Sequence, residues 1–266
     1  MTAPRTATTE PRGRRRWGRV LAVLAILGPG LIAANAGNLA GSLNDMFDAQ
    51  RNSTQRATAC FELRGDRAPE TVEAMARALQ TPELLSCAAT NLRIAGATGP
   101  LLHALSSTAP EVRAAAAREL GTFRDPEFLG TLTGAAGDEN LLAASAALEA
   151  LSQYDDPAVV PHLSELAVRG GMIGDMALDR LSKLAPAPSL RIARQLLEGS
   201  QVPDRLYALR VIGSFGDSSD LPALRKIAAA SDEDLEQHSR GFGFMPAINL
   251  SRAARAAIES VESRHP

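Results

Sequence analysis

The chain has 266 residues, 45% of them apolar, so it is long enough to bury a sizeable core and does not have the composition of a disordered protein. Aromatic residues make up only 4% and alanine is abundant, which favours closely packed helices over sheets. The net charge is −2, with six arginines and one glutamate in the first nineteen residues; beyond them no basic surface for nucleic acid is expected.

The N-terminal segment has the residue order of an export signal. Arg12 to Arg19 is basic, Val20 to Leu27 is apolar, and small residues continue to Ala36. Residues 17–40 are long enough as a helix to cross a bilayer. We therefore expect a signal anchor in the cytoplasmic membrane, with the basic tail 1–16 in the cytoplasm and the rest of the chain outside it. Two alternatives stay open: export after cleavage near Ala36, and a helix that belongs to the protein core.

The same segment resembles part of a membrane transporter. Residues 27–41 begin with Leu27-Gly28-Pro29-Gly30, end with Asn38-Leu39-Ala40-Gly41, and resemble the first transmembrane segment of Nramp-type divalent metal transporters. The resemblance implies an unwound helix in which a polar residue helps to bind the metal. Leu39 stands where that pattern has an aspartate, and no second hydrophobic span follows, so we expect no transport by this chain alone.

Residues 41–68 are predicted to connect this segment to the next domain and to cap that domain. The chain's two cysteines, Cys60 and Cys87, lack the spacing of a zinc site. Export would expose both thiols to oxidation, and a disulfide over this 27-residue interval would stabilise the fold by about 3 kcal/mol. A disulfide and two buried free thiols both remain open.

A repeated segment then dominates the chain, with Leu120-Gly121-Thr122-Phe123-Arg124-Asp125-Pro126 recurring 31 residues later as Leu151-Ser152-Gln153-Tyr154-Asp155-Asp156-Pro157. Leu181 and Ile212-Gly213-Ser214-Phe215 continue the series at intervals of 30 and 31. Such a period is typical of a solenoid of helix pairs. The Asp-Pro steps mark helix starts, since Asp caps a helix and Pro fits its first turn. Six pairs are predicted, the last one irregular: 69–80 with 82–95, 99–107 with 110–123, 126–136 with 138–154, 157–169 with 171–184, 187–199 with 203–215, and 219–230 with 246–263.

The segment Pro110-Glu111-Val112-Arg113-Ala114-Ala115-Ala116-Ala117-Arg118-Glu119-Leu120-Gly121, echoed by residues 204–213, resembles HEAT repeats of the short bacterial kind, including those of phycobilin lyases. The resemblance covers about 69–263 and implies an α-solenoid. It also implies a scaffold or binding platform, because most members of that family serve in this way. Its few enzymes use residues that the repeat motif does not define.

The period breaks once, between Ala230 and Met245, where about fifteen residues are inserted. Insertions on one face of a solenoid are often binding sites. The insertion offers an apolar surface with polar neighbours as a possible partner-binding site: Phe242, Phe244, Met245, His238 and Arg240. The alternative is that the two phenylalanines fold back and seal the last repeat.

Other chemical patterns carry no assignment. Gly241-x-Gly243 has no preceding strand and no following Lys-Ser/Thr, so it is not a phosphate loop. The four histidines are scattered over different repeats, and no catalytic, cofactor-binding or metal-binding residue is predicted. No cofactor is predicted.

These patterns together predict an all-α protein, an α-solenoid of about six HEAT-like pairs over 69–266 with an N-terminal transmembrane or signal helix. The predicted function is a non-catalytic scaffold or adaptor for an unknown protein partner, tethered to the membrane with its repeats outside the cytoplasm and without nucleic acid. Two alternatives are a HEAT-repeat lyase or modification-enzyme subunit, and an accessory subunit of a transporter or envelope complex.

Overall fold

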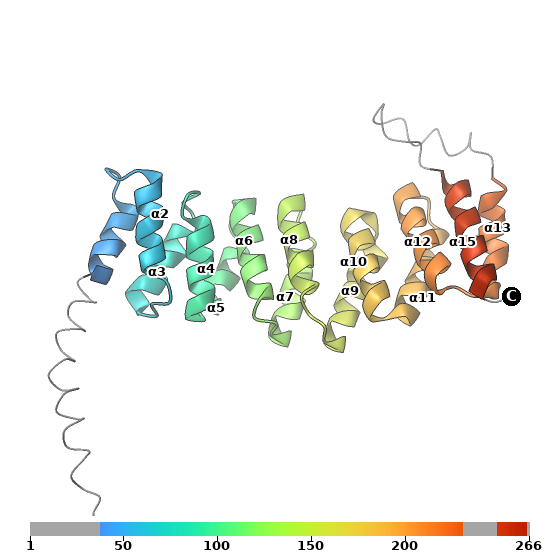
Figure 1. Ribbon diagram of the computed structural model, residues 1–266, viewed down its shortest axis with the longest axis horizontal. Coiled ribbons are helices and arrows are strands. Elements are labelled where there is room, and N and C mark those ends of the chain that lie inside the picture. Colours follow the sequence, from blue (N-terminus) through green and yellow to red (C-terminus); the bar gives the residue numbers. More distant parts are fainter. Residues whose placement is uncertain (1–37, 231–248, 265–266) are drawn as a thin grey trace, which may run out of the picture. The chain divides into compact units, whose positions relative to one another are not determined.

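The structure is a computed structural model that describes residues 38–230 and 249–264 (Figure 1). These residues form helices, turns and loops and contain no strand, which confirms the predicted all-α class and is consistent with an α-solenoid. The chain divides into two compact units, Met1–Ala74 and Met75–Pro266.

The described part of the first unit contains a helix over 38–47, helix α2 (Ser53–Glu62) and the start of α3 (Pro69–Ala78). The side chain of Asn52 accepts a hydrogen bond from the backbone of Gln55, and the Gln55 side chain accepts one from the backbone of Asn52. This reciprocal pair satisfies free donors at the start of α2. Met46 is fully buried, and its carbonyl accepts a hydrogen bond from Arg56 Nε at 3.0 Å. The predicted connector and cap is therefore mostly helical.

The second unit contains the helix pairs that the period predicted. Three of its first helices begin with a 3₁₀ turn, which the sequence reading did not separate from the helix. The elements are α4 (Leu85–Ala95), α5 (Thr98–Ala104), α6 (Pro110–Gly121), η1 (Pro126–Phe128), α7 (Leu129–Ala135), α8 (Leu141–Leu151), η2 (Pro157–Val159), α9 (Val160–Arg169), α10 (Gly171–Leu184), α11 (Pro186–Leu197), α12 (Val202–Phe215), η3 (Ser218–Asp220), α13 (Leu221–Ala228) and α15 (Leu250–Arg264).

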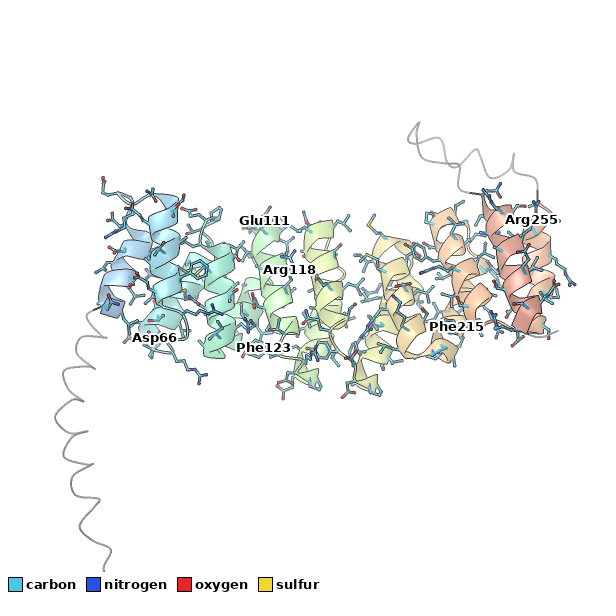
Figure 2. The ribbon with its side chains drawn as sticks, viewed as in Figure 1. Asp66, Glu111, Arg118, Phe123, Phe215 and Arg255 are labelled. Atoms are coloured by element: carbon cyan, nitrogen blue, oxygen red, sulfur yellow. The ribbon has the colours of Figure 1, made fainter. Side chains whose placement is uncertain are left out.

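Within this unit the second helices of successive pairs lie side by side: α6, α8, α10, α12 and α15 form one row (Figure 1). Helices α7, α9 and α11 form a row of first helices. Val112, Ala116 and Leu120 are buried on α6, as their spacing predicts. Glu111 and Arg118 of the same helix are exposed (Figure 2). The repeats thus present two helical faces to solvent, one from each row.

The Asp-Pro steps act as predicted at the helix starts. Asp125 accepts a hydrogen bond from the backbone N–H of Glu127 at 2.9 Å, and Asp156 accepts one from Ala158 at 2.7 Å. Asp217, which has no proline after it, accepts a bond from Ser219 in the same way at 2.8 Å. Each aspartate satisfies a backbone donor that the following helix leaves free.

The glycines of the repeated segment allow close contact between neighbouring second helices. A Cβ atom placed on Gly121 of α6 would lie 2.5 Å from Cβ and 2.7 Å from Cα of Ala150 on α8. The equivalent glycine, Gly213 on α12, would place a Cβ 3.3 Å from Cα of Ala257 on α15. Since non-bonded carbons prefer separations of about 3.5–4.0 Å, the contact at position 121 excludes any side chain.

Arginine–carboxylate pairs connect successive repeats. Arg113 donates to Asp138 through Nε and Nη2, at 2.6 and 2.8 Å. These bonds hold the pKa of the Asp138 carboxyl below its ordinary value, although desolvation acts in the opposite direction. Further pairs between successive repeats are Arg93–Glu119, Arg118–Glu149, Arg180–Asp155, Arg210–Asp179 and Arg194–Asp220, and Arg225–Glu262 joins the two helices of the last pair.

None of the helices within 38–230 and 249–264 combines the length and the apolar character that a membrane crossing requires. The predicted anchor 17–40 and the transporter-like segment 27–41 lie almost wholly outside these ranges, and both stay predictions. Residues 38–40 are helical.

Candidate functional site

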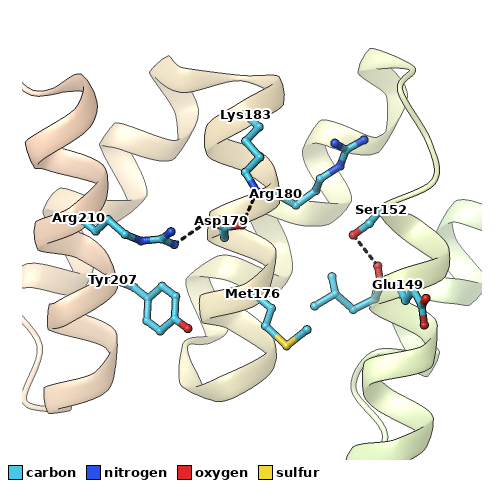
Figure 3. Close-up of a pocket in the computed structure, with 9 residues that line it drawn as sticks. Glu149, Ser152, Met176, Asp179, Arg180, Lys183, Tyr207 and Arg210 are labelled. Carbon is cyan, nitrogen blue, oxygen red and sulfur yellow. Dashed lines mark hydrogen bonds and ion pairs between the residues drawn. The ribbon is translucent and has the colours of Figure 1, made fainter. Parts of the chain in front are cut away.

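The second-helix row contains a groove of about 510 Å³ between α8, α10 and α12 (Figure 3). Its floor and rim combine apolar and charged side chains. The lining residues are Leu148, Glu149 and Ser152 of α8 and the segment that follows it, Met176, Asp179, Arg180 and Lys183 of α10, and Tyr207 and Arg210 of α12. A volume of this size suits a few side chains of a bound molecule.

The accessible apolar part of the groove is formed by Met176 and Tyr207, with the buried Leu148 behind them. A methionine on this face of a repeat helix can be buried against the neighbouring helix. The side chain of Met176 is instead 42% exposed. The guanidinium carbon of Arg210 lies 5.0 Å from the centre of the Tyr207 ring. A cation at this distance is attracted to the ring face, which holds both side chains in place. Met176 therefore presents a flexible apolar surface to a ligand beside a more rigid aromatic one.

The charged part of the groove is centred on Asp179. Its carboxylate accepts a hydrogen bond from Lys183 Nζ at 2.8 Å and forms an ion pair with Arg210 Nη2 at 2.7 Å. Burial alone would raise the pKa of Asp179, but the contacts with these two cations hold it below its ordinary value. Asp179 is thus ionised near neutral pH and shared between two cations.

Arg180 and Glu149 complete the rim. Arg180 donates to the carboxylate of Asp155 at 2.7 Å and to the carbonyl of Tyr154 at 3.3 Å. Glu149 lies 3.8 Å from Arg118, a long and exposed pair that contributes little to stability. The lining residues therefore carry three cations and two carboxylates, with the cations on α10 and α12 and Glu149 on α8.

Next to the groove lies a buried acid, Asp175. It is 2% exposed, and its Oδ1 atom has no hydrogen-bond partner among the described residues. Desolvation and, to a smaller extent, the charge of Asp204 raise the pKa of Asp175 to about 6, while Arg210 acts in the opposite direction. Asp204 itself accepts a hydrogen bond from the backbone of Gly171 at 3.0 Å, which caps α10 from the neighbouring helix. Asp175 is not among the lining residues, but its charge interacts with that of Arg210, which lines the groove.

A second hollow of about 450 Å³ lies on the other side of α12, between this helix and α15. Arg210 lines both hollows. Arg264, at the end of α15, donates to the carbonyl oxygens of Gly213 and Gly216 at 2.6 and 3.1 Å. Because these bonds occupy Arg264 within the fold, the groove between α8, α10 and α12 offers more free polar groups to a ligand.

The residues predicted as a partner-binding site, Phe242, Phe244, Met245, His238 and Arg240, lie outside the described residues and stay a prediction. Cys60 and Cys87 are both disulfide-bonded, and these are the only two cysteines of the chain. The same bond in the protein in solution stays a prediction. In the described part of the chain no three His, Cys, Asp or Glu side chains gather as metal ligands would.

Sequence reasoning did not find the groove. A signal for it exists: Met176, Arg180 and Lys183 lie at i, i+4 and i+7 on α10, and Met176 stands where α6 and α8 carry Ala115 and Ala146. Large side chains at that spacing share one helix face. The sequence does not show which helices face these side chains of α10, so the groove could not be predicted from them.

No curated protein matches the chain. Among solved structures, human deoxyhypusine hydroxylase in complex with glycerol is 18% identical, with 89% of this chain and 100% of that chain covered and a TM-score of 0.42. An engineered protein is also 18% identical, with coverage of 85% and 96% and a TM-score of 0.31. At TM-scores below 0.5 neither likeness bears on the fold or the activity of this chain.

Residues 98–170 match a family profile described as HEAT repeats. This match contains α5 to α9, including the segment Pro110–Gly121 on which the resemblance rests. Two successive helix pairs of the second unit, and with them the α8 side of the groove, therefore match the HEAT-repeat profile.

Proposed function

We propose that this chain is a non-catalytic scaffold that binds a partner protein in the groove between α8, α10 and α12. One observation carries the proposal: Met176 is 42% exposed in a groove that is also lined by charged side chains. Apolar side chains combined with polar neighbours are the usual composition of a protein-binding surface. The HEAT repeats over 98–170 support the same function, since such repeats commonly mediate protein interaction.

The proposal includes a location. The basic, apolar and small segments in residues 12–36 support a membrane tether over 17–40, with the repeats outside the cytoplasm. Intact mass of the natively expressed protein, recovered separately from membrane and soluble fractions, tests it. Full-length protein in the membrane is the expected result. A soluble product that starts near Gly37 would replace the tether by export after cleavage.

The binding surface is tested in two steps. A photo-crosslinking amino acid is placed at Met176 in the native host, and the crosslinked protein is identified by mass spectrometry and purified. Its Kd is then measured for the wild-type chain and for Met176→Ser. Removing a central apolar contact of an interface weakens binding about tenfold or more.

Met172→Ser is the matched control. Met172 lies one turn earlier on α10 and is 61% exposed, but it does not line the groove. We expect its Kd to stay within about twofold of the wild-type value. Equal weakening by both variants, or by neither, would contradict the groove as the binding surface and would direct the search to residues 238–245.

A further inference from the structure

The cations in the groove have hydrogen-bond donors beyond those that Asp179 uses. Lys183 has three N–H donors and Arg210 has five, and each makes one short contact with the Asp179 carboxylate, at 2.8 and 2.7 Å. Their side chains are 65% and 53% exposed. Asp179 is the one lining carboxylate in contact with both cations, which leaves several of their donors available at this end of the groove, while the buried Asp175 also interacts with the charge of Arg210.

The apolar surface lies at a short distance from those donors. Met176 is three residues before Asp179 and seven before Lys183 on α10, which corresponds to about 4.5 and 10 Å along the helix. Figure 3 shows Met176 and Tyr207 beside the contacts of Asp179 with Arg210 and Lys183. Side chains three or four residues apart on a helix are about 5–6 Å apart, so a short segment of a partner can reach both parts.

We infer that the groove binds a segment of a partner protein that carries an Asp or Glu side chain close to a large apolar side chain. This inference rests on the proposed function and adds the chemistry of the partner. The carboxylate accepts hydrogen bonds from Lys183 and Arg210, and the apolar side chain packs on Met176 and Tyr207. Charge-assisted bonds of this kind are stronger than bonds between neutral groups.

The carboxylates of the groove argue against a polyanion as the occupant. Glu149 lines the α8 side and Asp179 lies between the cations, so a nucleic acid would place phosphates next to both of them. A single carboxylate can bind Lys183 and Arg210 while it brings only one negative charge close to Asp179. An apolar neighbour also gives Met176 a partner, which a sugar–phosphate backbone does not.

The test begins without an assumed sequence. A phage-displayed library of random 12-residue peptides is selected on the full chain in mild detergent, and the enriched peptides are synthesised. We expect Asp or Glu near Leu, Ile, Met or Phe in the enriched set. For one such peptide, replacing the acid by its amide, or the apolar residue by Ser, should each weaken binding about tenfold.

Two variants assign the binding to the groove. Lys183→Gln and Arg210→Gln each remove one cation, and each should weaken the acidic peptide about tenfold but leave the amide peptide unchanged within about twofold. Lys183→Arg should restore binding. Arg210 also contacts Tyr207, so circular dichroism checks its folding, and Lys183, at the end of α10, carries the conclusion if the Arg210 variant fails to fold.

Arg225→Gln is the control, because Arg225 forms a similar exposed pair with Glu262 at 2.9 Å but lies outside the groove. Peptides that bind in the groove without an acid would overturn the partner chemistry and leave the proposed function standing. Acidic peptides that bind the Lys183→Gln and Arg210→Gln variants as tightly as the wild-type chain would overturn the groove as their binding site. An acidic peptide that binds equally well without its apolar residue, or a library that yields no binder, would also overturn the inference.

Discussion

Two regions of the second-helix row differ in their packing. Helices α6 and α8 are in close contact, whereas α8, α10 and α12 leave a groove between them. Between α6 and α8, Gly121 and Ala150 meet so closely that no side chain fits between them. Between α8 and α12, Met176, Arg180 and Tyr207 stand at the face of the row, and a groove of about 510 Å³ remains. Small residues bring the helices into contact, whereas long ones leave a lined hollow.

The two regions also differ in how they treat charge. Arg113 and Asp138, at the N-terminal ends of the same two helices, are mostly shielded from solvent and form two short bonds with each other. In the groove Lys183, Asp179 and Arg210 form a chain of three charges that solvent reaches. The Arg113–Asp138 pair stabilises the fold, whereas Lys183 and Arg210 keep hydrogen-bond donors available to solvent. A solenoid can therefore change from structural to binding repeats through a few positions on its second helices.

Gly121→Ala should produce the largest effect, because the added methyl group meets the backbone of Ala150. We expect a loss of about 2–3 kcal/mol in the free energy of unfolding, in the upper part of the range for overpacked contacts. Thermal unfolding followed by circular dichroism measures it. Gly134→Ala is the control: this exposed helical glycine has open space around it, and alanine there should stabilise the fold by about 0.5–1 kcal/mol. Destabilisation by both variants would refute the close-contact explanation.

Asp175→Asn should stabilise the groove region by about 1–2 kcal/mol at neutral pH, since an amide carries no charge to desolvate. The folded-state pKa of about 6 lies above the ordinary value of 3.8. Between these pH values the folded chain keeps a proton that the unfolded chain has released, so the contribution of Asp175 to stability falls as the pH rises from 3.8 to about 6. Denaturation midpoints across this window should show a gain for the variant that vanishes at the acidic end. A gain that does not depend on pH would rule out titration of Asp175 as its cause.

Tyr154→Phe tests a contact on the closely packed side. Tyr154 is fully buried after α8, and its hydroxyl donates at 3.0 Å to the carbonyl of Asp125, which caps the first helix of the same pair. Removing one buried hydrogen bond should cost about 1 kcal/mol, measured by chemical denaturation. An unchanged denaturation midpoint would mean that this hydrogen bond contributes nothing to stability beyond the packing of the aromatic ring.

Phe215→Ser should have the smallest effect, although Phe215 occupies the same repeat position as Tyr154 and Phe123. Phe215 is 40% exposed at the end of α12, whereas Phe123 packs edge-on against Phe128 with ring centres 6.1 Å apart (Figure 2). We expect a change within about 0.5 kcal/mol in the melting experiment that is used for Gly121→Ala. A loss as large as that of Tyr154→Phe would show that the position, and not its burial, sets the effect.

The helix pairs could be predicted because their signals are local. Asp125 and Asp156 cap the helices that follow them, and Val112, Ala116 and Leu120 recur at helical spacing on the buried face of α6. The short 3₁₀ turns before α7, α9 and α13 were missed, since propensity does not separate them from the first turn of an α-helix. The groove was missed because Met176 and Tyr207 lie 31 residues apart and meet only across two repeats.

By itself, the sequence determined the all-α class, the period of about thirty residues and the helix starts. The fold class and the helix starts depend on neighbouring residues and on spacing along one helix. The period follows from comparing one repeat with the next along the sequence. Tertiary structure alone decided which second helices touch and which leave a groove, and that Asp179 is shared by Lys183 and Arg210. Contacts of this kind arise between repeats, where the effect of a side chain's size depends on the residues of the helix that faces it.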